Sequence, residues 1–143
     1  QPLEVTGEVK GMPVGIGKAG VLAEPVSLDA LAKQVKQAFE LPFVLVYGSE
    51  AAKGPVSRVA VSPGAGGSMI RYALEQKAQV LVTGDIGHHD AIDAAAQGMA
   101  IIDAGHYGLE HIFIPFMADY VKRVSGGSIE VIQAEPDFPA RVL

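Results

Sequence analysis

The sequence predicts an α/β protein, a single domain unit in which a parallel or mixed sheet is flanked by helices. The first observation behind this is that short apolar runs alternate with amphipathic stretches, which is the pattern of a sheet covered on both faces. The second is size and composition. A chain of 143 residues with 49% hydrophobic and 19% charged side chains suits one folded unit and is too apolar for a disordered chain.

The opening part of the chain predicts little regular structure before its first helix. Residues 1–20 are rich in glycine and proline, which is typical of a loop with an edge strand. Ser27 then precedes apolar residues at helical spacing, where a serine can cap a helix. These apolar residues are Leu28, Leu31, Val35 and Phe39. The first helix is therefore expected between Ser27 and Pro42.

Five short apolar runs predict the strands of the sheet. They are residues 43–47, 59–61, 80–82, 100–102 and 129–132. Helices are expected between them, where a capping serine, an alanine-rich stretch or an apolar stripe replaces the strand pattern. The expected helices follow Ser68, cover residues 91–97 and extend from His106 to about Val124. The proline-rich tail, residues 136–139, is expected on the surface.

Charge and composition exclude several classes of function. The chain has 11 Lys and Arg against 16 Asp and Glu, for a formal net charge of -5. The broad positive field that binds nucleic acid is therefore missing. No apolar run approaches the roughly 18 to 20 residues that span a bilayer, so we expect no membrane partner and a cytoplasmic location. Because the chain has no cysteine, any metal must be held by nitrogen and oxygen ligands.

A glycine-rich turn follows the run at residues 59–61. Its Gly64, Gly66, Gly67 and Ser68 can direct backbone N–H groups at an anion such as phosphate, helped by the dipole of the next helix. The turn lacks the lysine of a Walker A loop. The alternative is a tight turn between strand and helix that needs positive φ angles. The local sequence leaves both interpretations open.

Two histidines stand together after the run at residues 80–82. His88 and His89 lie between Asp85 and Asp90. Imidazoles and carboxylates in an irregular loop can bind a transition metal or transfer protons. The alternative is structural: Asp85 or Asp90 caps the next helix, one histidine packs and the other is solvated. The local sequence does not choose between the two.

A histidine and a glutamate follow the run at residues 100–102. His106 and Glu110 lie four residues apart on one face of the expected helix. An imidazole and a carboxylate in that arrangement can reach one divalent ion. The alternative is an ordinary surface pair. His111 points about 100° away from Glu110 around the helix and is the weaker candidate.

The pair alone does not complete a metal site, because an open catalytic zinc site uses three protein ligands. Further ligands would come from His88 and His89, from Asp103 or from outside this chain. Zn, Mn, Fe and Co all accept nitrogen and oxygen ligands, so the sequence does not select the ion.

Together these motifs resemble the NIF-three-like family of dinuclear-metal-centre hexameric proteins, also known as GTP cyclohydrolase I type 2 homologues. The resemblance is carried by residues 83–90, which read Thr-Gly-Asp-Ile-Gly-His-His-Asp, and by Gly105-His106-Tyr107 with Glu110. The glycine-rich turn and the helix after Ser27 stand in the expected order. The resemblance implies that His106 and Glu110 each ligate one of two divalent metal ions.

The resemblance corresponds to the C-terminal half of such a protein. Family members carry an earlier half that supplies a His-His pair and a bridging carboxylate, and nothing before Gly15 corresponds to it. Gln1 also stands in place of an initiating Met. We therefore expect residues 1–143 to be a C-terminal portion whose N-terminal half is absent. That half, and further copies in a homohexamer, are the expected partners.

The activity that the resemblance implies is metal-dependent hydrolysis of a purine nucleotide, as in GTP cyclohydrolases. His88 and His89 do not match the family's metal ligands and are expected to act as catalytic proton-transfer residues beside the metals. The glycine-rich turn would receive phosphate. The alternative is a metal-binding or interaction scaffold without turnover. An enzyme needs an open coordination position and a substrate-sized cavity, whereas a scaffold does not.

Overall fold

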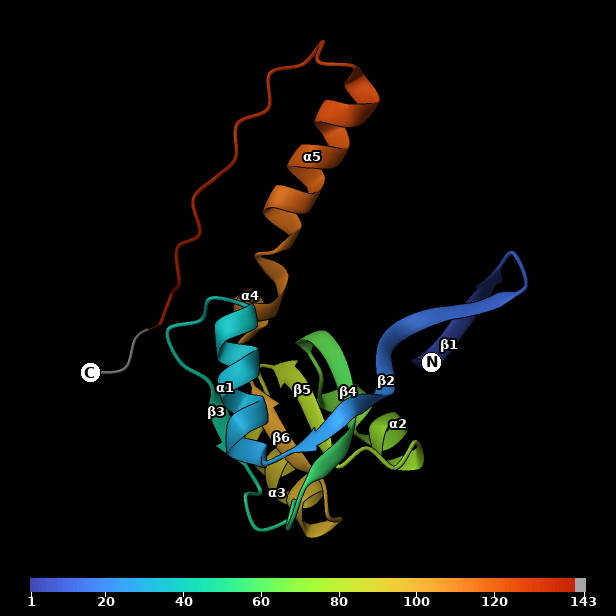
Figure 1. Cartoon of the computed structure of the whole chain (residues 1–143), viewed down its shortest axis with the longest axis vertical. Coiled ribbons are helices and arrows are strands. Elements are labelled where there is room, and N and C mark those ends of the chain that lie inside the picture. The colour runs from blue at the N-terminus through green and yellow to red at the C-terminus, as the bar shows by residue number, and fades with distance from the viewer. Residues whose placement is uncertain (141–143) are drawn as a thin grey trace.

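A six-stranded mixed sheet forms the centre of the structure (Figure 1), a computed structural model that describes residues 1–140. The strands lie in the order β1-β2-β4-β5-β6-β3. β4, β5 and β6 are parallel, while the other neighbours pair antiparallel. The bounds are β1 (Pro2–Val9), β2 (Met12–Val26), β3 (Leu45–Tyr47), β4 (Val56–Ala65), β5 (Val80–Gly84) and β6 (Ala100–Asp103). This confirms the predicted α/β class with a mixed sheet.

Helices cover both faces of the parallel strands and bury their alternating side chains. Leu81 and Ile101 pack on one side with residues of α2 and α3, while Val82 and Ile102 pack on the other with residues of α1 and α4. The helices are α1 (Leu28–Ala38), α2 (Ile70–Glu75), α3 (His88–Ala96), α4 (His106–Glu110) and α5 (Phe113–Ser125), with a 3-10 turn η1 (Gly67–Met69) before α2. The four central strand residues are at most 1% exposed. Successive residues of these strands face opposite sides of the sheet, and both sides are buried. This explains why the strands are continuous apolar runs in the sequence.

The predicted helix after Ser27 is confirmed as α1. The Ser27 hydroxyl accepts a hydrogen bond from the Ala30 backbone N–H at 3.2 Å, which satisfies one of the donors left free at a helix start. Leu28 and Leu31 are buried on the sheet.

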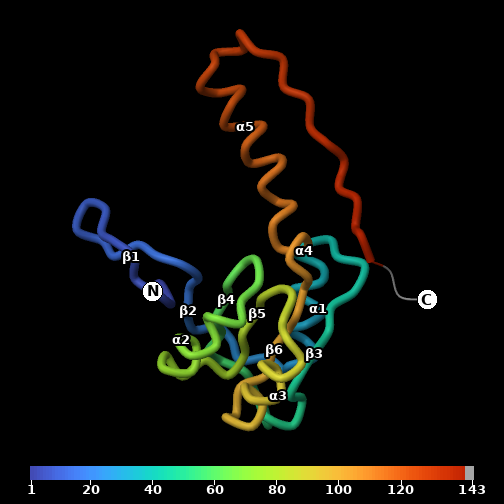
Figure 2. The backbone as a smooth tube through the Cα atoms, turned by 180° about the vertical axis from the view of Figure 1, so that it is seen from behind, coloured from blue at the N-terminus to red at the C-terminus, as the bar shows by residue number. Residues whose placement is uncertain are grey.

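The prediction of a loop with an edge strand at the start of the chain was incomplete. β1 and β2 form a long antiparallel hairpin, and only the second part of β2, from Lys18 onward, also pairs with β4. The far end of the hairpin projects from the body in both views (Figures 1 and 2). Most of its side chains are exposed. Such a strand lacks the apolar alternation by which a half-buried strand is recognised.

The predicted long helix from His106 to about Val124 is wrong, because it is two helices separated at His111 and Ile112. Pro115 lies in the first turn of α5, where proline is tolerated. α5 then projects from the body, and the following chain returns along it (Figures 1 and 2). The strand predicted at residues 129–132 is also wrong, since these residues pair with no strand.

Three smaller expectations differ from the structure. β4 continues to Ala65, so part of the glycine-rich segment is strand. Ser68 lies inside η1 and does not cap a helix by its side chain. α3 begins at His88 and not at Ala91. Within residues 1–140, no helix combines the length and apolar character that crossing a membrane requires.

Candidate functional site

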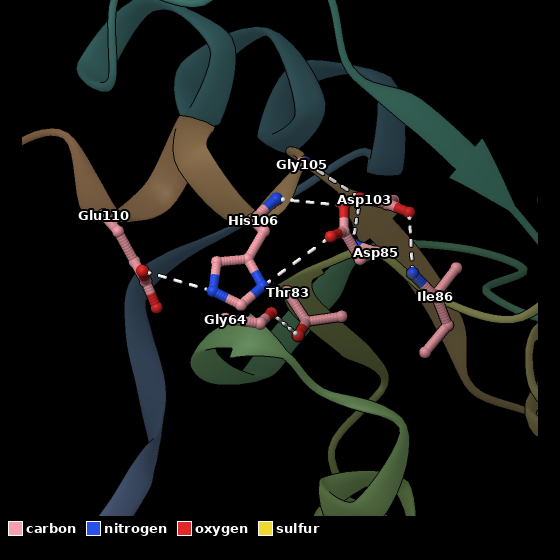
Figure 3. A network of polar contacts seen from close by, with 8 residues as sticks. All are labelled: Gly64, Thr83, Asp85, Ile86, Asp103, Gly105, His106 and Glu110. Atoms are coloured by element: carbon pink, nitrogen blue, oxygen red, sulfur yellow. Dashed lines mark hydrogen bonds and ion pairs between the residues drawn. The ribbon is translucent and has the colours of Figure 1, made fainter. Parts of the chain in front are cut away.

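The carboxyl ends of the three parallel strands bring polar side chains together, as expected for an open α/β sheet. Gly64 belongs to the end of β4, Asp85 follows β5, and His106 follows β6 through a two-residue connection. Figure 3 shows these residues around the imidazole ring of His106. Residues far apart in sequence therefore meet at one edge of the sheet.

The side chains of His106 and Glu110 are in direct contact. Nε2 of His106 lies 3.2 Å from Oε2 of Glu110, and each side chain is 48% exposed. Both residues belong to α4, one turn apart, which confirms the predicted placement on one helical face. The pair is open to solvent and to a further ligand.

A second carboxylate lies on the other side of the same ring. Oδ2 of Asp85 is 3.6 Å from Nδ1 of His106, and Oδ1 accepts a hydrogen bond from the His106 backbone N–H at 3.2 Å. One imidazole is thus placed between two carboxylates (Figure 3). The sequence indicated Asp85 as a helix cap or a ligand, but the N-cap of α3 is Gly87 and no side chain caps this helix. Its contact with His106 depends on the sheet and has no local sequence signal.

Asp103 holds the two loops that carry these residues. Its Oδ1 accepts hydrogen bonds from the backbone N–H groups of Asp85 and Gly105, at 3.1 and 2.8 Å. Its Oδ2 accepts one from Ile86 at 3.0 Å. The residue is only 9% exposed. Both oxygens are therefore engaged by backbone donors, so Asp103 is a structural anchor in this arrangement.

The glycine-rich segment contacts the pair through Gly64. This residue has a φ of 71°, and a Cβ there would lie 3.0 Å from Oε1 of Glu110 and 3.5 Å from the ring of His106. Its carbonyl accepts a weak hydrogen bond from the Thr83 hydroxyl at 3.4 Å. Because Gly64 has no side chain, it leaves room for the side chains of His106 and Glu110, the two predicted ligands.

The rest of the glycine-rich segment faces other groups. The Gly66 N–H donates to the Gly84 carbonyl at 3.3 Å. A Cβ on Gly67 would lie 3.1 Å from Oδ2 of Asp90. The Asp90 carboxylate thus adds negative charge beside this turn, which opposes an anion. Phosphate binding by Gly64, Gly66, Gly67 and Ser68 stays a prediction.

The two adjacent histidines do not contact the pair. His88 and His89 form the exposed first turn of α3 and not an irregular loop. Their rings touch each other edge to face, with centroids 5.6 Å apart. Within residues 1–140 neither ring is hydrogen-bonded or ion-paired to His106 or Glu110. His111, the weaker candidate, has Nδ1 3.0 Å from the Gly108 carbonyl and packs on Phe138.

The chemistry of the donor set fits a cation. A neutral imidazole has one N–H and one lone pair, so in that form only one of the two flanking carboxylates can accept a hydrogen bond from the ring. Two bonds of about 2.0 to 2.1 Å at a tetrahedral angle place their donor atoms about 3.3 to 3.4 Å apart, which is close to the 3.2 Å between His106 Nε2 and Glu110 Oε2. Across residues 1–140, no group of three or more histidine or carboxylate side chains is placed to hold an ion. Metal binding by His106 and Glu110 therefore stays a prediction, and the described residues alone do not supply three such ligands.

Comparison with known proteins confirms the family resemblance of the sequence. The model of the family Duf34/NIF3 (NGG1p interacting factor 3) matches residues 1–137. A protein of Streptococcus pneumoniae serotype 4 named GTP cyclohydrolase 1 type 2 homolog is 36% identical over 126 residues, 85% of this chain and 47% of its own length. NIF3-like protein 1 of Bos taurus is 31% identical over 86% of this chain and 32% of its own length.

Solved structures give the same result for the fold. A Bacillus cereus protein related to NIF3 superimposes with a TM-score of 0.78 at 28% identity, over 93% of this chain and 37% of its own. The Staphylococcus aureus protein SA1388 superimposes with a TM-score of 0.77 at 26% identity, over 92% and 45% of the two chains. The chain spans about half or less of the length of these relatives. With a matching family model across almost all of its residues, it belongs to the Duf34/NIF3 family.

Proposed function

We propose that His106 and Glu110 are ligands of a divalent first-row metal ion. The observation that carries the proposal is the 3.2 Å separation of His106 Nε2 and Glu110 Oε2, with the Asp85 carboxylate facing the other ring nitrogen. A histidine that ligates a metal commonly directs its second nitrogen at a carboxylate. The absence of sulfur ligands leaves Zn, Mn, Fe and Co as candidates.

The complete site would hold two ions and would take further ligands from outside these residues. Two protein ligands are fewer than the three of an open catalytic zinc site. Because the relatives are about twice as long as the aligned segment or longer, an N-terminal half of the same protein is the proposed source. This chain alone is then expected to bind metal weakly.

The proposed activity is metal-dependent hydrolysis of a purine nucleotide, which the names of the relatives support. A divalent ion supplies Lewis acidity that favours attack of water on an electron-poor carbon. His106 and Glu110 would hold the metal ion at this edge of the sheet. The exposed His88 or His89 would transfer a proton after a rearrangement that brings the histidine to the substrate. The segment Gly64–Ser68 would meet the phosphate.

A non-catalytic metal-binding or interaction scaffold is the second candidate, and one observation favours it. α5 exposes Phe113, Phe116, Tyr120 and Val124, which are 44 to 65% exposed. Their spacing of three, four and four residues places them on one face of the helix. Exposed apolar faces of this kind mark protein contacts. We propose that α5 joins copies of the protein in a homo-oligomer, with a hexamer as the expected form.

Calorimetric titration of the chain with zinc and with manganese tests the metal proposal. We expect heat of binding from the unaltered chain and its loss in His106→Ala and Glu110→Gln. Glu75→Gln is the matched control, since Glu75 is an exposed helical carboxylate that pairs with Arg71, and its replacement should leave the heat of metal binding unchanged. Equal heats in all four proteins would remove His106 and Glu110 as ligands.

Incubation of the metal-loaded protein with GTP separates the two candidate functions. A ring-opened product detected by chromatography supports the hydrolase, and its loss in His88→Ala or His89→Ala supports proton transfer by these residues. Metal binding without any product supports the scaffold.

A further inference from the structure

We infer that the segment after α5 holds α4 in place through Phe138, and that Phe138 is thereby a positioning residue for His106 and Glu110. This segment, residues 126–140, is called the return segment below. The metal role of the His106–Glu110 pair rests on the proposed function, whereas the contact of the return segment with α4 does not.

The first step is that α4 is too short to be stable by itself. It contains five residues, His106–Glu110, and isolated helices shorter than about 12 to 15 residues are marginal in water. The placement of its side chains therefore depends on packing against the rest of the chain.

The second step is that two neighbouring rows of side chains run along α4. His106 and Glu110 form one row, and Tyr107 and His111 form the next, with the members of each row four residues apart. One short helix carries both rows. A contact that fixes Tyr107 and His111 therefore also restricts the movement of the candidate ligands.

The third step is that the return segment makes such a contact. The ring centroid of Phe138 lies 5.6 Å from that of Tyr107 and 5.5 Å from that of His111. Both pairs are edge to face, an arrangement that aromatic rings prefer. The backbone N–H of Asp137 donates a hydrogen bond to the Tyr107 hydroxyl at 3.3 Å. Phe138 also packs against the buried cluster that contains Leu109 of α4.

Phe138 is an anchor in a segment that is otherwise mostly exposed. Among residues 126–140, only Val131 and Phe138 are partly buried. The chain leaves α4 through α5, projects from the body and returns toward α4 in both views (Figures 1 and 2). Because closing such a loop costs entropy, the contacts at its returning end have to offset that cost. The helix that carries the candidate ligands is thus attached to the rest of the loop at both of its ends.

Phe138→Ala tests the contact by hydrogen exchange of backbone amides, followed by NMR in the metal-free chain. The informative amides are those of Leu109 and His111, which donate to the carbonyls of Gly105 and Tyr107. We expect both to exchange at least about fivefold faster, the factor that corresponds to two aromatic pairs at the low end of their usual strength. The amide of Ala91, in the first turn of α3, should exchange as before.

Three further variants control for size and for location. Phe138→Tyr keeps the ring and should restore slow exchange. Tyr107→Phe removes only the hydroxyl that accepts from Asp137, so it should accelerate the same amides by a smaller factor. Ile132→Ala shortens a side chain of the same segment that is 84% exposed, and it should have no effect.

Zinc affinity, measured by calorimetry, reports the consequence for the His106–Glu110 pair. A ligand that binds only when α4 is in place loses apparent affinity in proportion to the fraction of molecules that are competent to bind it. We therefore expect zinc to bind Phe138→Ala at least about threefold more weakly than the unaltered chain. Phe138→Tyr should restore the affinity, and Ile132→Ala should leave it unchanged.

The outcomes separate the inference from the proposed function. Unchanged exchange at Leu109 and His111 in Phe138→Ala would overturn the inference even if His106 binds zinc. Faster exchange with unchanged zinc affinity, in a chain whose zinc binding is lost in His106→Ala, would reject the positioning role. If the unaltered chain and His106→Ala bind zinc alike, the metal role fails, and faster exchange would still support the hold of the return segment on α4.

Discussion

Gly84 at the end of β5 and Gly105 before α4 are in backbone contact. A Cβ on Gly84 would lie 2.5 Å from the carbonyl carbon of Gly105 and 2.5 Å from the backbone nitrogen of His106. Both distances are far below van der Waals contact. This close approach is possible because Gly84 has no side chain. The position of His106 at the start of α4 therefore requires a glycine at residue 84.

Gly84→Ala should therefore destabilise the fold and displace His106. We expect the free energy of unfolding to fall by about 2 to 3 kcal/mol, because the added methyl group meets backbone that cannot rotate away. Urea denaturation measures this loss. Gly20→Ala is the control: Gly20 lies in β2 with no atom within 4 Å of the added Cβ. A similar loss in both variants would contradict the explanation by close contact.

Gly64→Ala should act on the site as well as on the fold. Its φ of 71° disfavours a residue with a Cβ, and that Cβ would also press on Glu110. We expect a loss of about 1 to 2 kcal/mol in unfolding free energy together with weaker zinc binding. Gly54→Ala is matched, since Gly54 has a φ of 93° and no neighbour. Gly54→Ala should lower the free energy of unfolding without weakening zinc binding. If it weakened zinc binding as well, the effect of Gly64→Ala on zinc would be explained by backbone strain and not by contact with Glu110.

Much of the fold could be predicted because its signals are local. The buried strands β5 and β6 are continuous apolar runs, and Ser27 marks the start of α1. Residues 129–132 have a similar apolar pattern, but they lie in the segment that returns along α5, away from the sheet (Figure 1). Ile132 is 84% exposed. An apolar run that does not reach an edge of the sheet has no strand to pair with and forms no strand.

One contact of the candidate site could be predicted from the sequence, and the others could not. The contact of His106 with Glu110 follows from helical spacing, which the sequence contains. The contacts of Asp85 and Asp103 join residues 17 to 21 positions apart and depend on the parallel register of β5 and β6. The spacing of these residues in the sequence does not predict their contacts.

Asp103→Asn should destabilise the whole edge of the sheet. The buried carboxylate accepts three backbone N–H groups, whereas an amide has one oxygen and would place N–H groups against at least one donor. We expect a loss of about 2 to 3 kcal/mol in unfolding free energy and faster hydrogen exchange at Asp85, Ile86 and Gly105. Asp93→Asn is the exposed control. Unchanged exchange at these three amides would reject the anchor role of Asp103.

Phe116→Ser should reduce self-association without disturbing the fold. Phe116 is 65% exposed on α5 and lines the groove that also contains Glu110. If α5 joins copies of the protein, removal of this ring takes apolar area from the contact and shifts the population toward monomer. Sedimentation velocity over a range of concentrations measures that shift, and circular dichroism should show unchanged helix content. Lys122→Ala is the control, because Lys122 lies on the opposite side of α5 from the exposed apolar stripe. An equal distribution of species for the unaltered chain and Phe116→Ser would exclude this face as the contact between copies.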